Sequence, residues 1–154
     1  MLSDRESEAM LRIPRSIVEA MLDHARRESL QECCGLLAGK DGLVTHHYPA
    51  TNADASPTTY SIDSRQLLQI HRDIREAGLD IVSVYHSHPM SGAYPSPTDV
   101  NRAFWEEAEI ETYPGCIHLI ISLAEGDEPV LRGFRIPNRT TIEEVPITVV
   151  EDAP

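Results

Sequence analysis

The sequence predicts an α/β fold: a single three-layer domain in which a mixed central β-sheet is flanked by helices. The chain has 154 residues, which is the size of one domain. Its hydrophobic content of 41% and charged content of 25% are typical of globular proteins. Helical and extended patterns alternate in the first half, whereas hairpins dominate the ends. This order indicates one sheet with helices packed on it.

One domain is expected over residues 1–154, with residues 1–12 as a flexible segment. The first ten residues are polar and acidic, so we expect no signal peptide. No run reaches the roughly 18–20 apolar residues that a membrane span needs. The longest apolar stretch, residues 116–124, is interrupted by a histidine and a serine and is predicted to be a core strand.

The first helix is expected over residues 13–30, because it begins with a proline and its apolar residues then recur at helical spacing. Two strands follow, over residues 33–39 and 43–48. Asp41-Gly42 between them predicts a tight hairpin turn. Residues 49–58 are rich in Pro, Asn, Asp, Ser and Thr, which predicts a loop.

A second helix is expected to begin at Ser64 and to end at Gly78, a residue that suits a helix C-terminus. Residues 80–86 follow as a strand of the buried type. Three prolines mark residues 87–97 as a loop, and a third helix is expected over residues 98–109.

The C-terminal part of the chain is predicted to be extended. A break at Pro114-Gly115 is followed by apolar stretches typical of strands over residues 117–123, 130–136 and 142–150.

The formal net charge of −12 disfavours some partners. Such a field repels a phosphate backbone and an anionic membrane surface, so neither nucleic acid nor membrane is an expected partner. An acidic surface fits ordinary solubility, and a salt-rich cytoplasm is a second interpretation.

The three cysteines indicate a reducing compartment. Their number is odd, and Cys33 and Cys34 are adjacent, where a mutual disulfide would be strained. We therefore expect a cytoplasmic protein in which these two residues and Cys116 act as small buried apolar side chains.

Two histidines and one aspartate form the pattern that most clearly indicates a functional site. His86 and His88 stand at positions i and i+2 at the end of a predicted strand, where extended backbone directs both side chains to the same side. Pro89 ends that strand. Asp99 lies in the first turn of the next helix, and the loop between can fold back to bring its carboxylate to the imidazoles.

Two histidines and one carboxylate can bind a single metal ion. With tetrahedral zinc they leave the fourth position for water, which is typical of a catalytic site. Non-haem iron uses the same ligands with more open positions and stays an alternative. The residues alone also allow a simpler interpretation, in which these are ordinary strand-end histidines and Asp99 only caps a helix.

Residues 86–99, HSHPMSGAYPSPTD, resemble the signature of the JAMM (MPN-plus) metalloprotease family. They contain His-x-His-Pro, an aspartate after ten further residues, and a serine, Ser96, three residues before that aspartate. The family also carries a glutamate ahead of a Cys-Gly-Leu-Leu-type run, and here Glu32 precedes CCGLLAG. The resemblance implies the JAMM/MPN fold, which has a layered architecture similar to that of the cytidine deaminases.

The resemblance also implies a role for each of these residues. His86, His88 and Asp99 would hold one Zn²⁺ per chain. Glu32 would be the general base that takes a proton from water and delivers it to the leaving amine. Ser96 would donate a hydrogen bond to the oxyanion, a role compatible with capping the following helix. Without the resemblance, Glu32 would be one acid among 25.

The remaining histidines and the two aromatic residues after the motif are expected to have structural rather than catalytic roles. His24 and His71 are expected to be solvated on their helices, and His118 to be a core histidine or a partner of the metal ligands. Phe104 and Trp105 are expected in the core. Of His46 and His47, adjacent on one strand, one should face inward and the other outward.

The implied reaction is zinc-dependent hydrolysis of a peptide or isopeptide bond at the C-terminal tail of a ubiquitin-like or sulfur-carrier protein. The chain is short and resembles the compact prokaryotic branch, which includes Mec-type hydrolases that release cysteine from a sulfur carrier. The tail could bind by strand addition at a sheet edge. A non-catalytic MPN-type scaffold is the alternative. A zinc deaminase is disfavoured, since its His-x-Glu and Cys-x-x-Cys pairings are missing.

Overall fold

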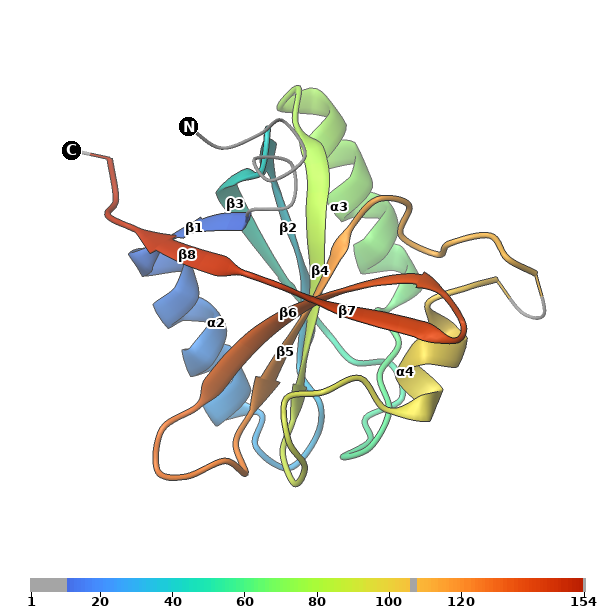
Figure 1. Cartoon of the computed structure of the whole chain (residues 1–154). Helices are drawn as coiled ribbons and strands as arrows, with labels where there is room; N and C mark the ends of the chain where they lie inside the picture. Colours follow the sequence, from blue (N-terminus) through green and yellow to red (C-terminus); the bar gives the residue numbers. More distant parts are fainter. Residues whose placement is uncertain (1–10, 106–107, 154) are drawn as a thin grey trace.

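The computed structural model describes residues 11–105 and 108–153. Within these residues it contains an eight-stranded mixed sheet with the strand order β7-β6-β5-β4-β2-β3-β1-β8 (Figure 1). Helices α2 and α3 cover opposite faces of this sheet. The predicted three-layer α/β architecture is therefore confirmed.

In chain order the elements are β1 (Leu11–Pro14), α2 (Arg15–Arg27), β2 (Cys34–Lys40), β3 (Leu43–Ala50), α3 (Ser64–Glu76), β4 (Asp80–His88), α4 (Pro97–Arg102), β5 (Ile117–Ser122), β6 (Val130–Asn138), β7 (Thr141–Val145) and β8 (Ile147–Val150).

The centre of the sheet is formed by β2, β4 and β5. Strand β2 runs antiparallel to both β3 and β4, and β4 runs parallel to β5. The hairpin predicted between β2 and β3 is confirmed, because Asp41 and Gly42 adopt φ angles of 53° and 77°. Positive φ at both central residues is what a type I′ turn requires.

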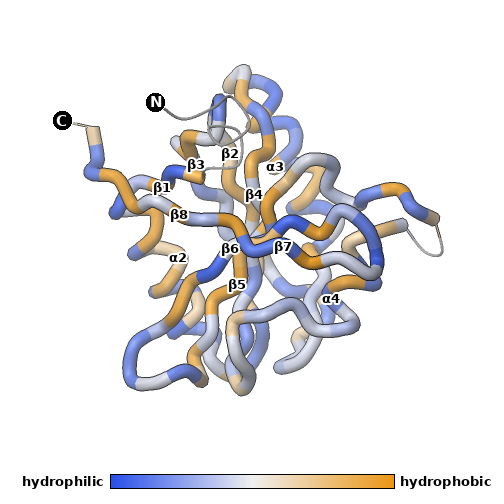
Figure 2. The backbone as a smooth tube through the Cα atoms, in the orientation of Figure 1, coloured by the Kyte–Doolittle hydropathy of each residue, from blue (hydrophilic) through white to orange (hydrophobic). Residues whose placement is uncertain are grey.

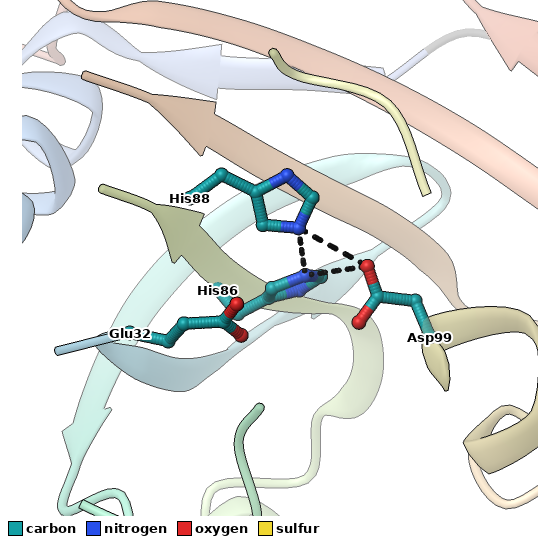
Figure 3. Close-up of side chains that lie close together, drawn as sticks. All are labelled: Glu32, His86, His88 and Asp99. Carbon is teal, nitrogen blue, oxygen red and sulfur yellow. Dashed lines mark hydrogen bonds and ion pairs between the residues drawn. The ribbon is translucent and has the colours of Figure 1, made fainter. Parts of the chain in front are cut away.

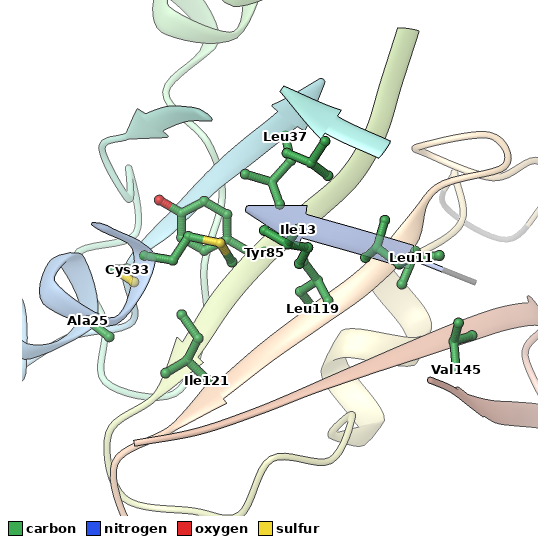
Figure 4. Packing of buried hydrophobic residues seen from close by; sticks show 12 residues of the cluster. Leu11, Ile13, Ala25, Cys33, Leu37, Tyr85, Leu119, Ile121 and Val145 are labelled. Carbon is green, nitrogen blue, oxygen red and sulfur yellow. The ribbon is translucent and has the colours of Figure 1, made fainter. Parts of the chain in front are cut away.

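The two faces of the sheet form separate hydrophobic layers. On the α2 face, Met21 and Ala25 of the helix pack in one cluster with Leu37, Leu119 and Ile121 of the strands (Figure 4). Figure 2 shows hydrophobic stretches along β4 and β5, whereas β6 and β7 mix hydrophobic and hydrophilic residues. Because successive side chains of a strand point to opposite faces of the sheet, the central strands bury side chains in both layers.

The α3 face is packed in the same way. Ile70 and Ile74 of that helix pack in one cluster with Leu36 and Val84 of the two central strands. Among the described residues every helix is too short or too polar to cross a bilayer.

The N-terminal prediction is wrong for the described residues. Residues 11 and 12, expected in a flexible segment, and Ile13, expected in a helix, form β1. Leu11 and Ile13 are fully buried, and β1 pairs in parallel with β8 at the far end of the chain. Local sequence could not show a strand whose partner is so distant. The helix consequently begins at Arg15 and ends at Arg27. Residues 1–10 lie outside the described residues.

The single strand expected over residues 142–150 is two strands. Strand β7 pairs with β6 at one edge of the sheet, whereas β8 pairs with β1 at the other edge. Only Pro146, which cannot donate to a strand ladder, separates them. The sheet must therefore be curled so that its two edges approach each other, and Val145 and Ile147 accordingly join the same hydrophobic cluster.

The third helix is shorter than expected. Helix α4 covers Pro97–Arg102, whereas the prediction extended to residue 109. Phe104 is buried as expected, but Trp105 is 60% exposed and does not belong to the core. Residues 106 and 107 lie outside the described residues.

A buried polar network connects α2, β3 and β4 on the face of the sheet that α2 covers. The Tyr85 hydroxyl lies 2.7 Å from His24 Nδ1 and 2.8 Å from His47 Nε2. His24 is only 5% exposed, so the prediction that it is solvated is wrong. His47 faces inward and His46 outward, as alternation along a strand requires. Burial lowers the pKa of His24, and it lowers the pKa of His47 to about 4.

This network should make the fold sensitive to acid. An unfolded histidine has a pKa of about 6.5, so between pH 6.5 and 4 the unfolded chain binds the proton that folded His47 refuses. The free energy of unfolding is therefore not reduced by His47 above pH 6.5, and it decreases as pH falls towards 4. We expect His47→Gln to weaken this loss, measured by urea unfolding of metal-free protein from pH 7 to 4.5. The exposed neighbour His46→Gln is the control, and an unchanged slope in His47→Gln would contradict the prediction.

Candidate metal centre

Strand β4 presents two imidazoles from its carboxyl end. The strand stays extended through His88, so His86 and His88 project from the same face, on which α3 also packs. In the register of the sheet, His86 lies between Cys34 of β2 and Ile120 of β5. Each histidine is only 3% exposed. Burial lowers the pKa of His86, which favours the neutral imidazole that a metal ion requires.

Helix α4 brings the aspartate to these histidines. Ser96 is the N-cap of the helix: the Asp99 amide donates to its hydroxyl oxygen, 3.0 Å apart, and its own amide donates to Asp99 Oδ2, 2.9 Å apart. This capping box fixes the rotamer of the carboxylate. The same oxygen, Oδ2, faces both imidazoles.

Three potential ligand atoms form a nearly equilateral triangle. His86 Nε2, His88 Nε2 and Asp99 Oδ2 are each 3.1 Å from the other two (Figure 3). Ligands of tetrahedral zinc, each about 2.0–2.1 Å from the ion, lie roughly 3.3 Å apart. The triangle therefore has the size that three ligands of one metal ion require.

Glu32 completes the cluster from the segment before β2. Figure 3 shows its carboxylate directed toward the other three side chains, and the potential ligand atoms of all four lie within 4.8 Å of one another. Glu32 is 2% exposed, and its Oε1 is buried without a hydrogen-bond partner. Burial, followed by the charge of Asp99, raises the pKa of Glu32 to about 8. Such an orphaned oxygen fits a site that also accommodates an ion and water.

Neighbouring groups orient the two histidines. His88 Nδ1 is 2.8 Å from the Gly92 carbonyl, so a proton on Nδ1 donates to that oxygen and leaves Nε2 free as a ligand. The Tyr60 ring stacks on His86 with centroids 4.4 Å apart. His118 on β5 is close to His86, and burial lowers its pKa to about 4. This agrees with its prediction as a core histidine or a partner of the ligands.

Asn52 holds the loop that carries Tyr60 against Glu32. It is 2% exposed, and its side-chain amide donates to the carbonyls of Glu32, at 3.0 Å, and Thr59, at 2.9 Å. Its side-chain oxygen accepts from the amides of Asp54 and Ser61, each 3.0 Å away. Every polar group of this side chain is therefore used.

The sequence analysis missed Asn52, Tyr60 and Gly92, although the structure brings Glu32, His86, His88 and Asp99 together and places Ser96 beside Asp99. Asn52 and Tyr60 lie in or next to a polar loop, where nothing in the pattern separates them from neighbouring residues. Gly92 contributes only its backbone, which a motif of side chains does not record.

The chain belongs to the family of prokaryotic homologs of the JAB domain, which matches residues 14–136. It is 39% identical over 144 residues to the CysO-cysteine peptidase of Mycobacterium tuberculosis, and the match covers 92% of each protein. It is 38% identical to the desampylase of Haloferax volcanii over 68% of this chain and 74% of that protein. Membership of the compact prokaryotic JAMM family, predicted from the motif, is confirmed.

Solved structures confirm the fold. The solution structure of a Desulfitobacterium hafniense protein matches with a TM-score of 0.79 and 36% identity, covering 93% of this chain and 94% of that chain. A JAB1/MPN domain protein from Archaeoglobus fulgidus matches with a TM-score of 0.56 at 16% identity, covering 92% and 98%. This second likeness supports the JAB1/MPN fold alone.

Removal of the Asn52 side chain should disturb both the loop and Glu32. Asn52→Ala removes the partner of two backbone carbonyls and two amides; the bond to the Glu32 carbonyl is buried and the other three are partly buried. A buried group without a partner costs about 1–3 kcal/mol. We expect the free energy of unfolding to fall by at least about 2 kcal/mol, measured by urea denaturation. Asn138→Ala, which removes an exposed asparagine that caps a turn, is the matched control. Equal losses in the two variants would contradict the role of Asn52.

Proposed function

We propose that this protein is a zinc metallopeptidase that hydrolyses a peptide or isopeptide bond at the C-terminal tail of a ubiquitin-like or sulfur-carrier protein. The observation that carries the proposal is the triangle of two imidazole nitrogens and one carboxylate oxygen beside the orphaned carboxyl of Glu32. A non-catalytic scaffold would have no need to bury four such groups together, at the cost of their hydration.

Release of cysteine from a sulfur carrier is the preferred form of this activity. The relative named CysO-cysteine peptidase matches 92% of the chain, and the relative named desampylase matches 68%. The first name describes a peptidase that acts on CysO-cysteine, which agrees with release of cysteine from a carrier. We place the protein in the cytoplasm, since its three cysteines are free and buried.

The metal would be held by His86, His88 and Asp99, and the donor set of two imidazoles and one carboxylate suits zinc in a catalytic site. When bound, zinc supplies a Lewis acid that polarises a carbonyl and lowers the pKa of water. The Gly92 carbonyl and the capping box at Asp99 keep the donor atoms pointed at one spot.

In this proposal Glu32 is the residue that transfers the proton. Its unpartnered Oε1 is the atom that would accept a proton from the attacking water and later deliver it to the leaving nitrogen. The Ser96 oxygen accepts from the Asp99 amide, so its own O–H stays available to donate to the oxyanion. One side chain would thus cap α4 and stabilise the transition state.

The chain should bind one zinc ion. Because three convergent ligands are needed, His88→Ala should lower zinc affinity by at least about 100-fold. Isothermal titration of chelator-stripped protein, checked by elemental analysis, measures both stoichiometry and affinity. His46→Ala removes an exposed histidine and should leave both unchanged. Zinc binding that survives in His88→Ala would disprove the ligand assignment.

Hydrolysis should depend on Glu32. The zinc-loaded protein, incubated with a sulfur carrier that ends in Gly-Gly-Cys, should shorten the carrier by the mass of one cysteine residue. Glu32→Gln should slow this reaction by about 10²–10⁴-fold, the usual contribution of a general base, while it retains zinc. Mass spectrometry of the carrier measures the rate, and Glu19→Gln, at an exposed position of α2, is the matched control. Full activity of Glu32→Gln would rule out the assigned role.

A further inference from the structure

Arg102 stands between the metal centre and a neighbouring groove. The groove has a volume of about 480 Å³ and is bordered by the loop around Tyr60, by α3 and by the segment that follows α4. Arg102 lines this groove and also lines the narrow cleft that contains His86 and Asp99. Among the described residues that line either space, it is the only arginine or lysine.

The guanidinium of Arg102 is held in place but not fully used. Its Nη1 donates to Asp54 Oδ2, 2.7 Å away, and to the Tyr60 carbonyl, 2.9 Å away. Within the described residues no hydrogen bond uses its Nε or Nη2. The side chain is 47% exposed, so these N–H groups can be reached by a ligand. Because Arg102 and Asp99 share one short helix, the guanidinium has a defined position relative to the metal ligands.

Arg102 is a cation beside an acidic centre. Glu32 and Asp99 make the centre acidic, and the chain as a whole carries a net charge of −12. An anionic group on a substrate would be repelled here unless a cation received it, and guanidinium binds carboxylate by paired hydrogen bonds.

We propose that Arg102 binds the terminal carboxylate of the leaving amino acid, so that the site selects substrates whose scissile bond is followed by a single C-terminal residue. This inference rests on the proposed function. In a carrier–cysteine adduct only the cysteine Cα separates the scissile nitrogen from the carboxylate, which must therefore lie within a few ångströms of the reacting atoms. In an isopeptide, by contrast, the leaving amine belongs to a lysine side chain, with no carboxylate at this position.

The reaction balances with water as the only co-reactant. The C–N bond between the last glycine and the cysteine breaks, and the water oxygen forms a new bond to the glycine carbonyl carbon. One water proton ends on the cysteine nitrogen, and the second, which the new carboxyl group loses, protonates the released amine or passes to solvent. Free cysteine leaves with its amine and its carboxylate, and the carrier ends in a new carboxylate. Arg102 takes no proton in this sequence and only holds the leaving group.

Two adducts of one carrier test the proposal. A sulfur carrier that ends in Gly-Gly is prepared with an added C-terminal cysteine, either as the free acid or as the carboxamide, and cleavage by zinc-loaded enzyme is followed by mass spectrometry. Wild-type protein should prefer the acid by about 10- to 100-fold in kcat/KM, the value of a charged hydrogen bond. Arg102→Gln should lose this preference by slowing on the acid alone. Arg102→Lys, which keeps the charge without the paired donors, should retain part of it.

The ratio of the two rates makes the test independent of how much enzyme is folded. Asp54→Asn removes the same ion pair but leaves the guanidinium, so it should keep the preference and is the matched control. If Arg102→Gln keeps the wild-type ratio, or if wild type shows no preference, the assignment of Arg102 is overturned while the proposed function stands. If wild type cleaves neither adduct, the proposed function fails, and the assignment fails with it.

Discussion

The convergence of three potential ligand atoms at one point is the constraint on which the rest of the structure depends. Two buried imidazoles and a carboxylate, with a second carboxyl beside them, are expensive to remove from water unless a cation repays the loss of hydration. They stay together because rigid elements hold them. Strand β4 is extended through His88, and the capping box of α4 orients Asp99 so that one oxygen faces both histidines.

The face opposite the metal centre provides this rigidity. Side chains alternate along β4, so Tyr85 points away from His86 into the layer covered by α2. Its ring fits there only because its neighbour on β2 is glycine: a Cβ on Gly35 would lie 2.5 Å from Tyr85 Cε1. The Tyr85 hydroxyl joins His24 and His47. A well-packed, hydrogen-bonded layer thus supports a strand whose other face carries the reactive groups.

Loops determine the shape of the site on the other face. Asn52 ties the loop before α3 to the Glu32 backbone, and Arg102 ties the same loop to α4 through Asp54 and the Tyr60 carbonyl. Segments that carry the proposed base and a ligand are thereby connected through neutral and charged hydrogen bonds. This arrangement lets a short chain, without long insertions, build a defined cleft and an adjacent groove.

The sequence by itself determined the class of fold and the hairpin at Asp41-Gly42, because these depend on local periodicity and turn preferences. The spacing of His86, His88 and Asp99 allowed a metal site, and the resemblance to the JAMM signature predicted it. Only the tertiary structure decided that Glu32 lies beside that triangle, that Leu11 belongs to a strand, and that Pro146 divides two strands at opposite edges of the sheet. The physical reason is that strand pairing and loop anchoring join residues far apart in the chain. Their partners leave no local pattern, as the unremarkable sequence around Asn52 illustrates.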